Sequence, residues 1–119
     1  MKDFKKQKVW QKGHKLTLDV YKVTENFSKE ELYGLTSQIR RSCASIPANI
    51  SEGCVRETDA DFSRFLQIAM GSATELEYHL LLAHDLGILN DLNFGKLSKE
   101  TVEVKKMLTS FIKKLKADR

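Results

Sequence analysis

The sequence predicts an all-α fold, an up-down-up-down antiparallel four-helix bundle. Apolar residues recur at alternating spacings of three and four along four long stretches, which is the spacing of a bundle seam. The 119 residues include only six glycines and one proline, so few positions interrupt a helix. No stretch alternates apolar and polar residues as a strand does. We expect helices at about residues 7–27, 36–54, 58–86 and 92–116, in a single domain that spans residues 1–119.

Each expected helix contributes one seam to the core. In the first helix the seam is Val9, Gly13, Leu16, Val20, Val23 and Phe27. In the second it is Ile39, Cys43, Ile46, Ile50 and Cys54. In the third it is Phe62, Phe65, Leu66, Ala69, Met70, Ala73, Leu76 and Leu80. In the fourth it is Phe94, Leu97, Thr101, Val104, Leu108, Phe111 and Leu115.

The ends of the expected helices carry residues that cap or break a helix. A loop around Gly34 joins the first two helices, and Gly53 and Gly87 mark the ends of the second and third. Polar side chains can cap the starts: Thr36 or Ser37 for the second helix, Thr58 or Asp59 for the third, and Asp91 or Asn93 for the fourth.

The second helix contains the only proline, Pro47. Proline has no N–H, so the carbonyl of Cys43 loses its helical partner, and a bend is expected there. A proline inside a helix costs roughly 3 kcal/mol relative to alanine. We therefore expect the proline to serve packing or assembly.

A polar stripe runs beside the apolar seam of the second helix. It consists of Gln38, Ser42, Ser45, Asn49 and Glu52, and a matching stripe on the third helix holds Ser72, Glu75 and His79. The two stripes either form hydrogen bonds with each other, with water or across a subunit contact, or they form a solvated surface. Small side chains in the stripe favour close approach of a second helix.

Two adjacent arginines precede the proline. Arg40 and Arg41 point about 100° apart on a helix, so both cannot serve one contact. We expect one of them to pair with Glu75 or Glu52 and the other to face solvent or RNA.

Motifs of catalysis and metal binding are missing from the sequence. The residues three positions before His14, His79 and His84 are not acidic, so the Glu-x-x-His pairs of a di-iron bundle are absent. Glu75 and His79 form one i, i+4 pair, which is too few ligands for a metal site. Phosphate-binding glycine loops and G-x-S-x-G are also absent. We expect no catalytic residues, no cofactor and no metal, and hence no enzyme.

The sequence also indicates a compartment. The basic N-terminus has no apolar segment behind it, and no apolar run approaches about 18 residues, so neither a signal peptide nor a membrane span is expected. Cys43 and Cys54 lie about 16 Å apart on one helix, too far to bridge, and are expected to be reduced thiols. These features predict a cytoplasmic protein with no membrane partner.

Lysines are concentrated at the two ends of a chain with a net charge of +4. They form a candidate nucleic-acid surface. Its members are Lys5, Lys6, Lys8, Lys12, Lys15, Lys105, Lys106, Lys113, Lys114 and Lys116. The alternative is that these lysines solubilise exposed helix faces and pair with the acidic segment 57–87.

Apolar residues outside the seams favour an oligomer. Leu80, Leu81 and Leu82 are consecutive and cannot all face one core. Three residues of the first helix also lie off its seam: Trp10, Leu18 and Tyr21. Either one leucine is exposed, or the back of the third helix contacts another subunit.

The stretches YGLTSQIRRSCASIPANISEG and FLQIAMGSATELEYHLLLAHDLGIL resemble the 23S rRNA-intervening sequence protein family, a family of bacterial four-helix bundle proteins. Its motif matches Tyr33, Gly34, Gln38, Arg40, Arg41, Ser45, Pro47, Asn49, Glu52, Gly53, Gly71, Ser72 and Glu75. Ser51 departs from the family, which usually has alanine there.

The resemblance implies a four-helix protomer that commonly assembles as a homopentamer, and the family has no established catalytic residues to carry over to this chain. It also implies a relation to accessory proteins of diversity-generating retroelements, whose basic pentamer engages reverse transcriptase and nucleic acid. We therefore expect a non-enzymatic oligomer that binds structured RNA through lysine-rich faces, with itself and RNA or a nucleic-acid enzyme as partners. The alternative is a protein–protein assembly or accessory module without nucleic-acid affinity.

Overall fold

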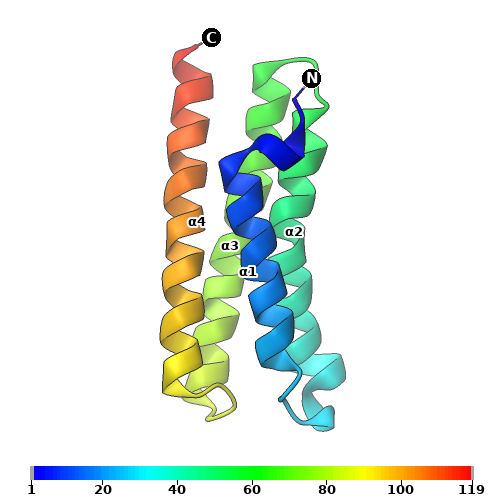
Figure 1. The fold of residues 1–119 in the computed structure, drawn as a ribbon, viewed down its shortest axis with the longest axis vertical. Helices are drawn as coiled ribbons and strands as arrows, with labels where there is room; N and C mark the ends of the chain where they lie inside the picture. Colours follow the sequence, from blue (N-terminus) through cyan, green and yellow to red (C-terminus); the bar gives the residue numbers. More distant parts are fainter. Residues whose placement is uncertain (1, 119) are drawn as a thin grey trace.

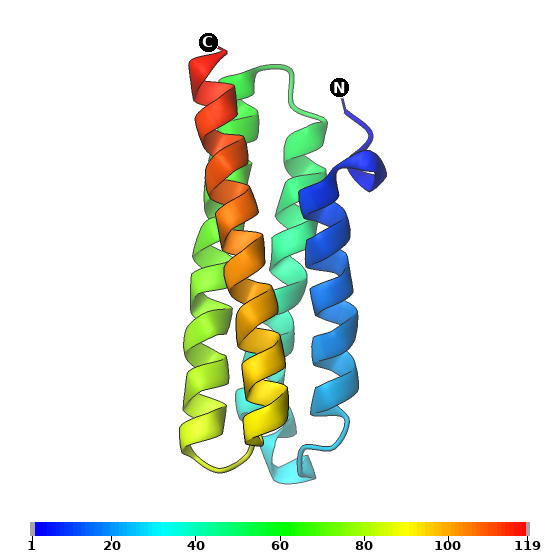
Figure 2. The same cartoon turned by 60° about the vertical axis from the view of Figure 1, so that its left-hand side comes forward.

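Four long helices form a bundle that measures 46 × 21 × 20 Å. The computed structural model describes residues 2–118, and within them α1 spans Lys8–Thr24, α2 Ser37–Cys54, α3 Asp59–Asp85 and α4 Asp91–Ala117. Successive helices run in opposite directions (Figure 1), and Figure 2 shows the same four helices with α4 in front of α2. The predicted up-down-up-down four-helix fold is confirmed, and each helix limit lies within three residues of its expected position.

The helix order around the bundle follows the chain. α1 packs against α2 and α4, and α3 packs against α2 and α4, so the first and last helices are neighbours. A short 3₁₀ turn, η1 (Phe4–Lys6), precedes α1 and brings the N-terminus to the end of α2, where Lys2 N donates to Cys54 O at 2.9 Å. The two lysine-rich ends of the chain therefore lie on adjacent helices.

The capping residue predicted from the sequence is correct for α3 and wrong for α4 and α2. Thr58 caps α3, since its Oγ1 accepts from Asp61 N at 3.1 Å. Asn90 caps α4 through its Oδ1, which accepts from Asn93 N at 2.8 Å, so neither Asp91 nor Asn93 is the cap. Thr36 precedes α2 but makes no capping hydrogen bond, because the chain is already helical when it enters α2.

The connection between α1 and α2 is helical rather than an open loop. It contains a 3₁₀ turn, η2 (Lys29–Glu31), and a π-helical turn, η3 (Leu32–Thr36), that runs directly into α2. Gly34 has φ −111° and ψ −110°, outside the helical region, and marks a kink within η3. The sequence did not reveal this because the helical turns carry no apolar period of their own.

The core is built from the four predicted seams. Its largest fully buried side chains are Leu16, Ile39, Ile46, Ile50, Leu66, Leu76, Leu80, Leu97 and Leu108. Of the consecutive leucines on α3, Leu80 is 1% exposed and Leu81 is 45% exposed, as expected of a run that cannot all face one core. Among the described residues, no helix is both long and apolar enough to span a membrane.

Pro47 lies in the contact between α1 and α2. The α2 helix runs through it unbroken, and Thr17 Oγ1 of α1 lies 3.4 Å from the Cys43 carbonyl that the proline leaves without a helical donor. A Cβ atom at Gly13 would lie 3.3 Å from Ile46 Cγ2 and 3.7 Å from Pro47 Cδ. Gly13 therefore lets α1 pack directly against the proline ring.

We expect Pro47→Ala to be less stable by about 1 kcal/mol. The variant loses two buried methylenes, each contributing about 0.8 kcal/mol, and it gains freedom in the unfolded chain. It recovers a helix hydrogen bond that contributes roughly 1 kcal/mol. The general proline cost of about 3 kcal/mol is not regained in full, because the Cys43 carbonyl already has Thr17 Oγ1 at 3.4 Å. Urea denaturation measures the difference, and a more stable variant would show that ring strain in α2 outweighs the packing at Gly13.

Candidate nucleic-acid interface

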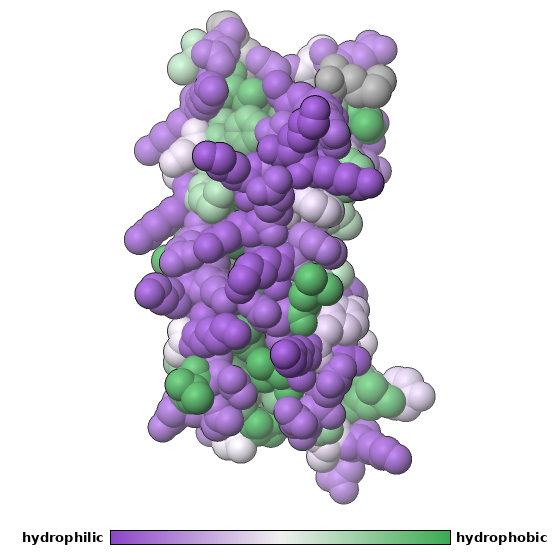
Figure 3. Space-filling view, viewed as in Figure 1, coloured by the Kyte–Doolittle hydropathy of each residue, from purple (hydrophilic) through white to green (hydrophobic). Residues whose placement is uncertain are grey.

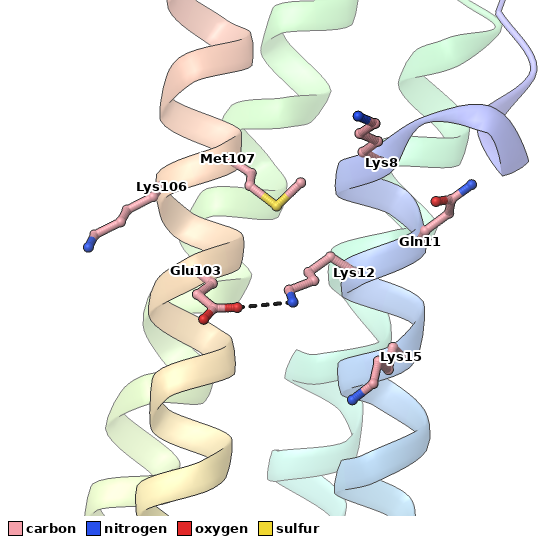
Figure 4. Close-up of a pocket in the computed structure, with 7 residues that line it drawn as sticks. All are labelled: Lys8, Gln11, Lys12, Lys15, Glu103, Lys106 and Met107. Carbon is pink, nitrogen blue, oxygen red and sulfur yellow. Dashed lines mark ion pairs between the residues drawn. The ribbon is translucent and has the colours of Figure 1, made fainter.

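The surface between α1 and α4 is hollowed into a continuous groove lined by lysines. It comprises two adjoining hollows of about 590 and 380 Å³ that share Lys8 and Met107. We call it the lysine groove and define it by six lysines: Lys6, Lys8, Lys12, Lys15, Lys106 and Lys114. Figure 4 shows Met107 pointing from α4 into the space between the helices, with Lys8, Lys12 and Lys15 on the α1 side, whereas the Lys106 side chain points from α4 away from α1.

The structure divides the ten predicted lysines into two groups. Six line the lysine groove, whereas Lys5, Lys105, Lys113 and Lys116 do not. Lys105 instead reaches α3, where its Nζ lies 2.9 Å from Glu77 Oε1. Hydrophilic side chains cover most of the face seen in Figure 3, which is the view of Figure 1 and includes α1 and α4.

Some of the groove lysines are paired with carboxylates and others are not. Lys12 Nζ lies 3.0 Å from Glu103 Oε2, and this pair crosses from α1 to α4 (Figure 4). Four groove lysines have no carboxylate oxygen of residues 2–118 within 4 Å of Nζ: Lys6, Lys8, Lys106 and Lys114. Pairing with a carboxylate is thus observed for Lys12, Lys15 and Lys105, and of these only Lys105 pairs with the acidic segment 57–87.

The pKa of Glu103 indicates the electrostatic character of the groove. The hydrogen bond and charge of Lys12 hold the pKa of the Glu103 carboxyl below its usual value, and the charges of Lys99 and Lys106 add to this effect. A carboxylate surrounded by several lysines is stabilised in its charged form. The same positive charge would attract the phosphates of a nucleic acid.

One wall of the groove ends in a cluster of two carboxylates and a lysine. Lys15 Nζ donates to Asp19 Oδ2 at 2.9 Å, which raises the pKa of Lys15, and it lies 3.4 Å from Glu100 Oε1. Burial is the largest single effect on Asp19 and disfavours its charged form. The hydrogen bonds with Lys15 and Glu100 and the charges of Lys15 and Lys96 together outweigh it, so the pKa of Asp19 is lowered. Burial, with the Asp19 charge, raises the pKa of Glu100, whose Oε2 is buried without a hydrogen-bond partner.

We expect Glu100→Gln to be more stable than the wild type at pH 7. The raised pKa of Glu100 stabilises the folded wild type below pH 4.5, its ordinary value, and this contribution is lost as pH rises through the folded pKa. Glutamine does not ionise, so the variant escapes that loss. Thermal unfolding at pH 4 and pH 7 should show a difference that grows with pH, and an equal difference at both would exclude titration of Glu100 as the cause.

The residues of the polar stripe join α2 to α3. Ser45 Oγ lies 2.8 Å from Ser72 Oγ, and Asn49 Nδ2 donates to the Ser45 carbonyl at 2.8 Å. Arg41 donates to Gln38 Oε1 at 3.0 Å and forms an ion pair with Glu75, as predicted for one of the two arginines. The hydrogen-bonded interpretation of the two stripes is therefore correct at these positions.

Arg40 does not simply face solvent. Its Nε donates to Thr24 Oγ1 at 2.8 Å, and its guanidinium lies 4.7 Å from the centre of the Tyr21 ring. Tyr33 beside it is 93% exposed. The sequence did not predict these contacts, because Tyr21 and Arg40 lie on different helices and the helical period relates only residues of the same helix.

The motif glycines and Glu52 have different surroundings. A Cβ atom at Gly53 would lie 2.8 Å from Phe62 Cδ1 and 3.0 Å from Phe65 Cβ, so the close packing of α2 on α3 requires glycine there. A Cβ atom at Gly71 would meet nothing within 4 Å. Glu52 forms an i, i+4 pair with Arg56 at 3.4 Å.

Sequence reasoning also missed an aromatic group beside the lysine-rich start of α1. Trp10 stacks on His14 with ring centres 4.9 Å apart, and Phe4 meets the Trp10 edge at 5.0 Å. The i, i+4 spacing of Trp10 and His14 was available as a signal.

The Cys43 thiol is a poor nucleophile at neutral pH, because burial raises its pKa to about 12. Among residues 2–118, no three His, Cys, Asp or Glu side chains are grouped to hold a metal.

Comparison with known proteins agrees with this architecture. The family described as 23S rRNA-intervening sequence protein matches residues 5–110. The chain belongs to this family. Curated proteins yield no match. A solved structure, a protein of unknown function from the S23 ribosomal protein family of Bacteroides thetaiotaomicron VPI-5482, is 30% identical with a TM-score of 0.80, and the alignment covers 88% of this chain and 98% of that one. Membership in the 23S rRNA-intervening sequence family thus confirms the resemblance.

Proposed function

We propose that this protein is a non-enzymatic, cytoplasmic assembly that binds nucleic acid, structured RNA in particular, through the lysine groove. The observation that carries the proposal is the placement of Lys6, Lys8, Lys106 and Lys114 along one groove without carboxylate partners in residues 2–118. Lysines on both walls can contact phosphates on either side of a bound strand or helix. The description of the family names 23S rRNA, which makes a structured RNA the first ligand to test.

Binding through this groove is directed at the nucleic-acid backbone. Lysine offers a mobile point charge and not the planar fork that arginine uses to read guanine. The apolar floor of the groove includes Met107 and Phe111, neither of which forms an exposed stacking platform. Affinity should therefore be steeply salt-dependent and only weakly sequence-selective.

Fluorescence anisotropy with a structured RNA and with duplex DNA tests the proposal. The salt concentration is varied from about 50 to 200 mM, where phosphate contacts lose most of their affinity. We expect log affinity to fall linearly with log salt for both ligands. If neither ligand binds at the low-salt end, the nucleic-acid function is excluded, and the protein–protein accessory module becomes the favoured function.

The second part of the proposal is assembly, and Gly71 supports it. Glycine in a helix interior costs about 1 kcal/mol relative to alanine, yet nothing in the protomer lies near a Cβ atom at this position of α3. Ile68 and Tyr78 on the same helix are 45% and 57% exposed. A second copy that approaches the backbone at Gly71 would cover both side chains and account for the glycine.

Native mass spectrometry at micromolar concentration tests assembly, and five chains are expected from the family resemblance. Gly71→Gln should dissociate the assembly because a long side chain blocks close approach. Gly95→Gln applies the same test to α4, since Gly95 also has nothing within 4 Å of an added Cβ and lies between the exposed Leu92 and Val102. If only one of the two variants dissociates, that variant identifies the helix that forms the contact. A wild-type monomer at every concentration would exclude self-assembly.

A further inference from the structure

The end of the bundle where α1 leads into α2 contains a second hollow. Its lining residues all lie between residues 21 and 41, and none belongs to α4. It consists of adjoining spaces of about 230 and 400 Å³ that share Leu32, Thr36 and Arg40. Its walls come from the last turns of α1, from η3 and from the first turn of α2, which meet at the lower end of the molecule in Figure 1. No residue of the lysine groove lines it.

Thr36 brings an unused hydrogen-bonding group to this hollow. The residue is only 3% exposed, and its Oγ1 is buried with no hydrogen-bond partner among the described residues. It lines both spaces. A buried hydroxyl without a partner destabilises a fold, and such groups are rare in native proteins unless a ligand, ion or water satisfies them. Because Oγ1 is covered in this structure, a ligand in the hollow can satisfy it only when a neighbouring side chain moves aside.

Arg40 brings a positive charge held in a fixed orientation. Its Nε donates to Thr24 Oγ1 at 2.8 Å, its Nη2 lies 3.4 Å from the Tyr21 carbonyl oxygen, and its guanidinium stacks on the Tyr21 ring. These contacts occupy one edge of the guanidinium, and no carboxylate oxygen of residues 2–118 lies within 4 Å of it. Lys29 and Glu25 line the smaller space with opposite charges, and Arg41, which lines the larger space, is paired with Glu75. Arg40 is therefore the cation left for an anion.

Tyr33 supplies a flat apolar surface at the mouth of the larger space. Its side chain is 93% exposed, and the kink at Gly34 follows it directly. Leu32 and Tyr21 beside it are 43% and 42% exposed. An exposed aromatic ring next to a fixed arginine suits a ligand that joins an anion to a planar ring, since aromatic side chains stack on nucleobases and arginine binds phosphate.

We propose that this hollow binds a nucleotide phosphate monoester. Its phosphate oxygens accept hydrogen bonds from the Arg40 guanidinium and the Thr36 hydroxyl, and its base stacks on Tyr33. The same chemistry occurs in a free mononucleotide and at the 5′-phosphorylated end of an RNA. The site is separate from the lysine groove and does not depend on it.

Isothermal titration with adenosine 5′-monophosphate, adenosine and inorganic phosphate tests the phosphate and base contacts. A short RNA with a 5′-phosphate and the same RNA with a 5′-hydroxyl test the second source. We expect adenosine 5′-monophosphate or the 5′-phosphorylated RNA to bind at least about tenfold more tightly than its form without phosphate. Preference within the RNA pair assigns the site to an RNA end, and binding of the mononucleotide alone assigns it to free nucleotide.

Thr36→Val is the decisive variant because it keeps the side-chain shape and removes only the hydroxyl. We expect its melting temperature to stay equal or rise, since a buried unpaired group is gone, while affinity for the phosphate ligand falls about tenfold. Thr74→Val, at an exposed threonine of α3, is the matched control and should leave affinity unchanged. Wild-type affinity in Thr36→Val, or no effect of the phosphate in either ligand pair, would overturn the proposal.

Discussion

Replacing Lys8, Lys106 and Lys114 together by glutamine is expected to weaken RNA binding about a hundredfold at 50 mM salt. All three side chains line the lysine groove and have no carboxylate partner in residues 2–118. Each lysine that contacts a phosphate contributes about 0.9 to the slope of log affinity against log salt on duplex DNA. Anisotropy titrations should therefore show a slope reduced by about 2 to 3 in the triple variant.

The matched control removes the same charge from outside the groove. Lys5, Lys113 and Lys116 belong to the same lysine-rich segments but do not line it. Their triple glutamine variant should keep most of the affinity, since only lysines that contact phosphate release counterions from it. Equal losses in the two triple variants would show that binding follows overall charge and not the groove.

Gly53→Ala is expected to lower the stability of the bundle by about 1–3 kcal/mol, which corresponds to a fall in Tm of roughly 4–12 °C. The added methyl group would lie 2.8 Å from Phe62 Cδ1 and 3.0 Å from Phe65 Cβ. The Phe65 Cβ atom is fixed to the α3 backbone, so rotation of a side chain cannot relieve the contact. The two helices must move apart.

Gly95→Ala is the control for the helix propensity of the substitution. Gly95 is exposed within α4, and an added Cβ atom meets nothing within 4 Å. This variant should be more stable by about 1 kcal/mol, the ordinary gain for alanine over glycine in a helix. Scanning calorimetry of both variants separates the two effects, and a stabilised Gly53→Ala would show that α2 and α3 are not tightly packed at this point.

The sequence predicted which segments are rich in lysine, but not which of these lysines line the groove. Lys8, Lys12 and Lys15 are three and four residues apart, so their common face on α1 follows from the helix period. Whether that face meets Lys106 and Lys114 depends on how α1 and α4 rotate about their axes when the core closes. The same rotation places Lys113 and Lys116 outside the groove and turns Lys105 toward Glu77.

The hollow at the α1–α2 junction could not be predicted because no local pattern describes it. The chain from Lys29 to Thr36 is too short to show a helical period and contains Gly34, yet it folds into η2 and η3 and carries Thr36 into the protein interior. Arg40 is then held by Thr24 and Tyr21, which lie 16 and 19 residues earlier. Contacts over such distances in sequence follow from packing.

By itself the sequence determined the helices, their order and the core, because the spacing of apolar residues follows the period of the helix and short connections force neighbouring helices to be antiparallel. The tertiary structure decided which polar residues meet. It gave Pro47 and Gly13 a common contact, paired Arg41 with Glu75, and left Arg40 without a carboxylate partner in residues 2–118. The physical reason is that burial of apolar area is a property of each helix face, whereas hydrogen bonds and ion pairs require atoms of different helices to lie within about 3 Å of each other.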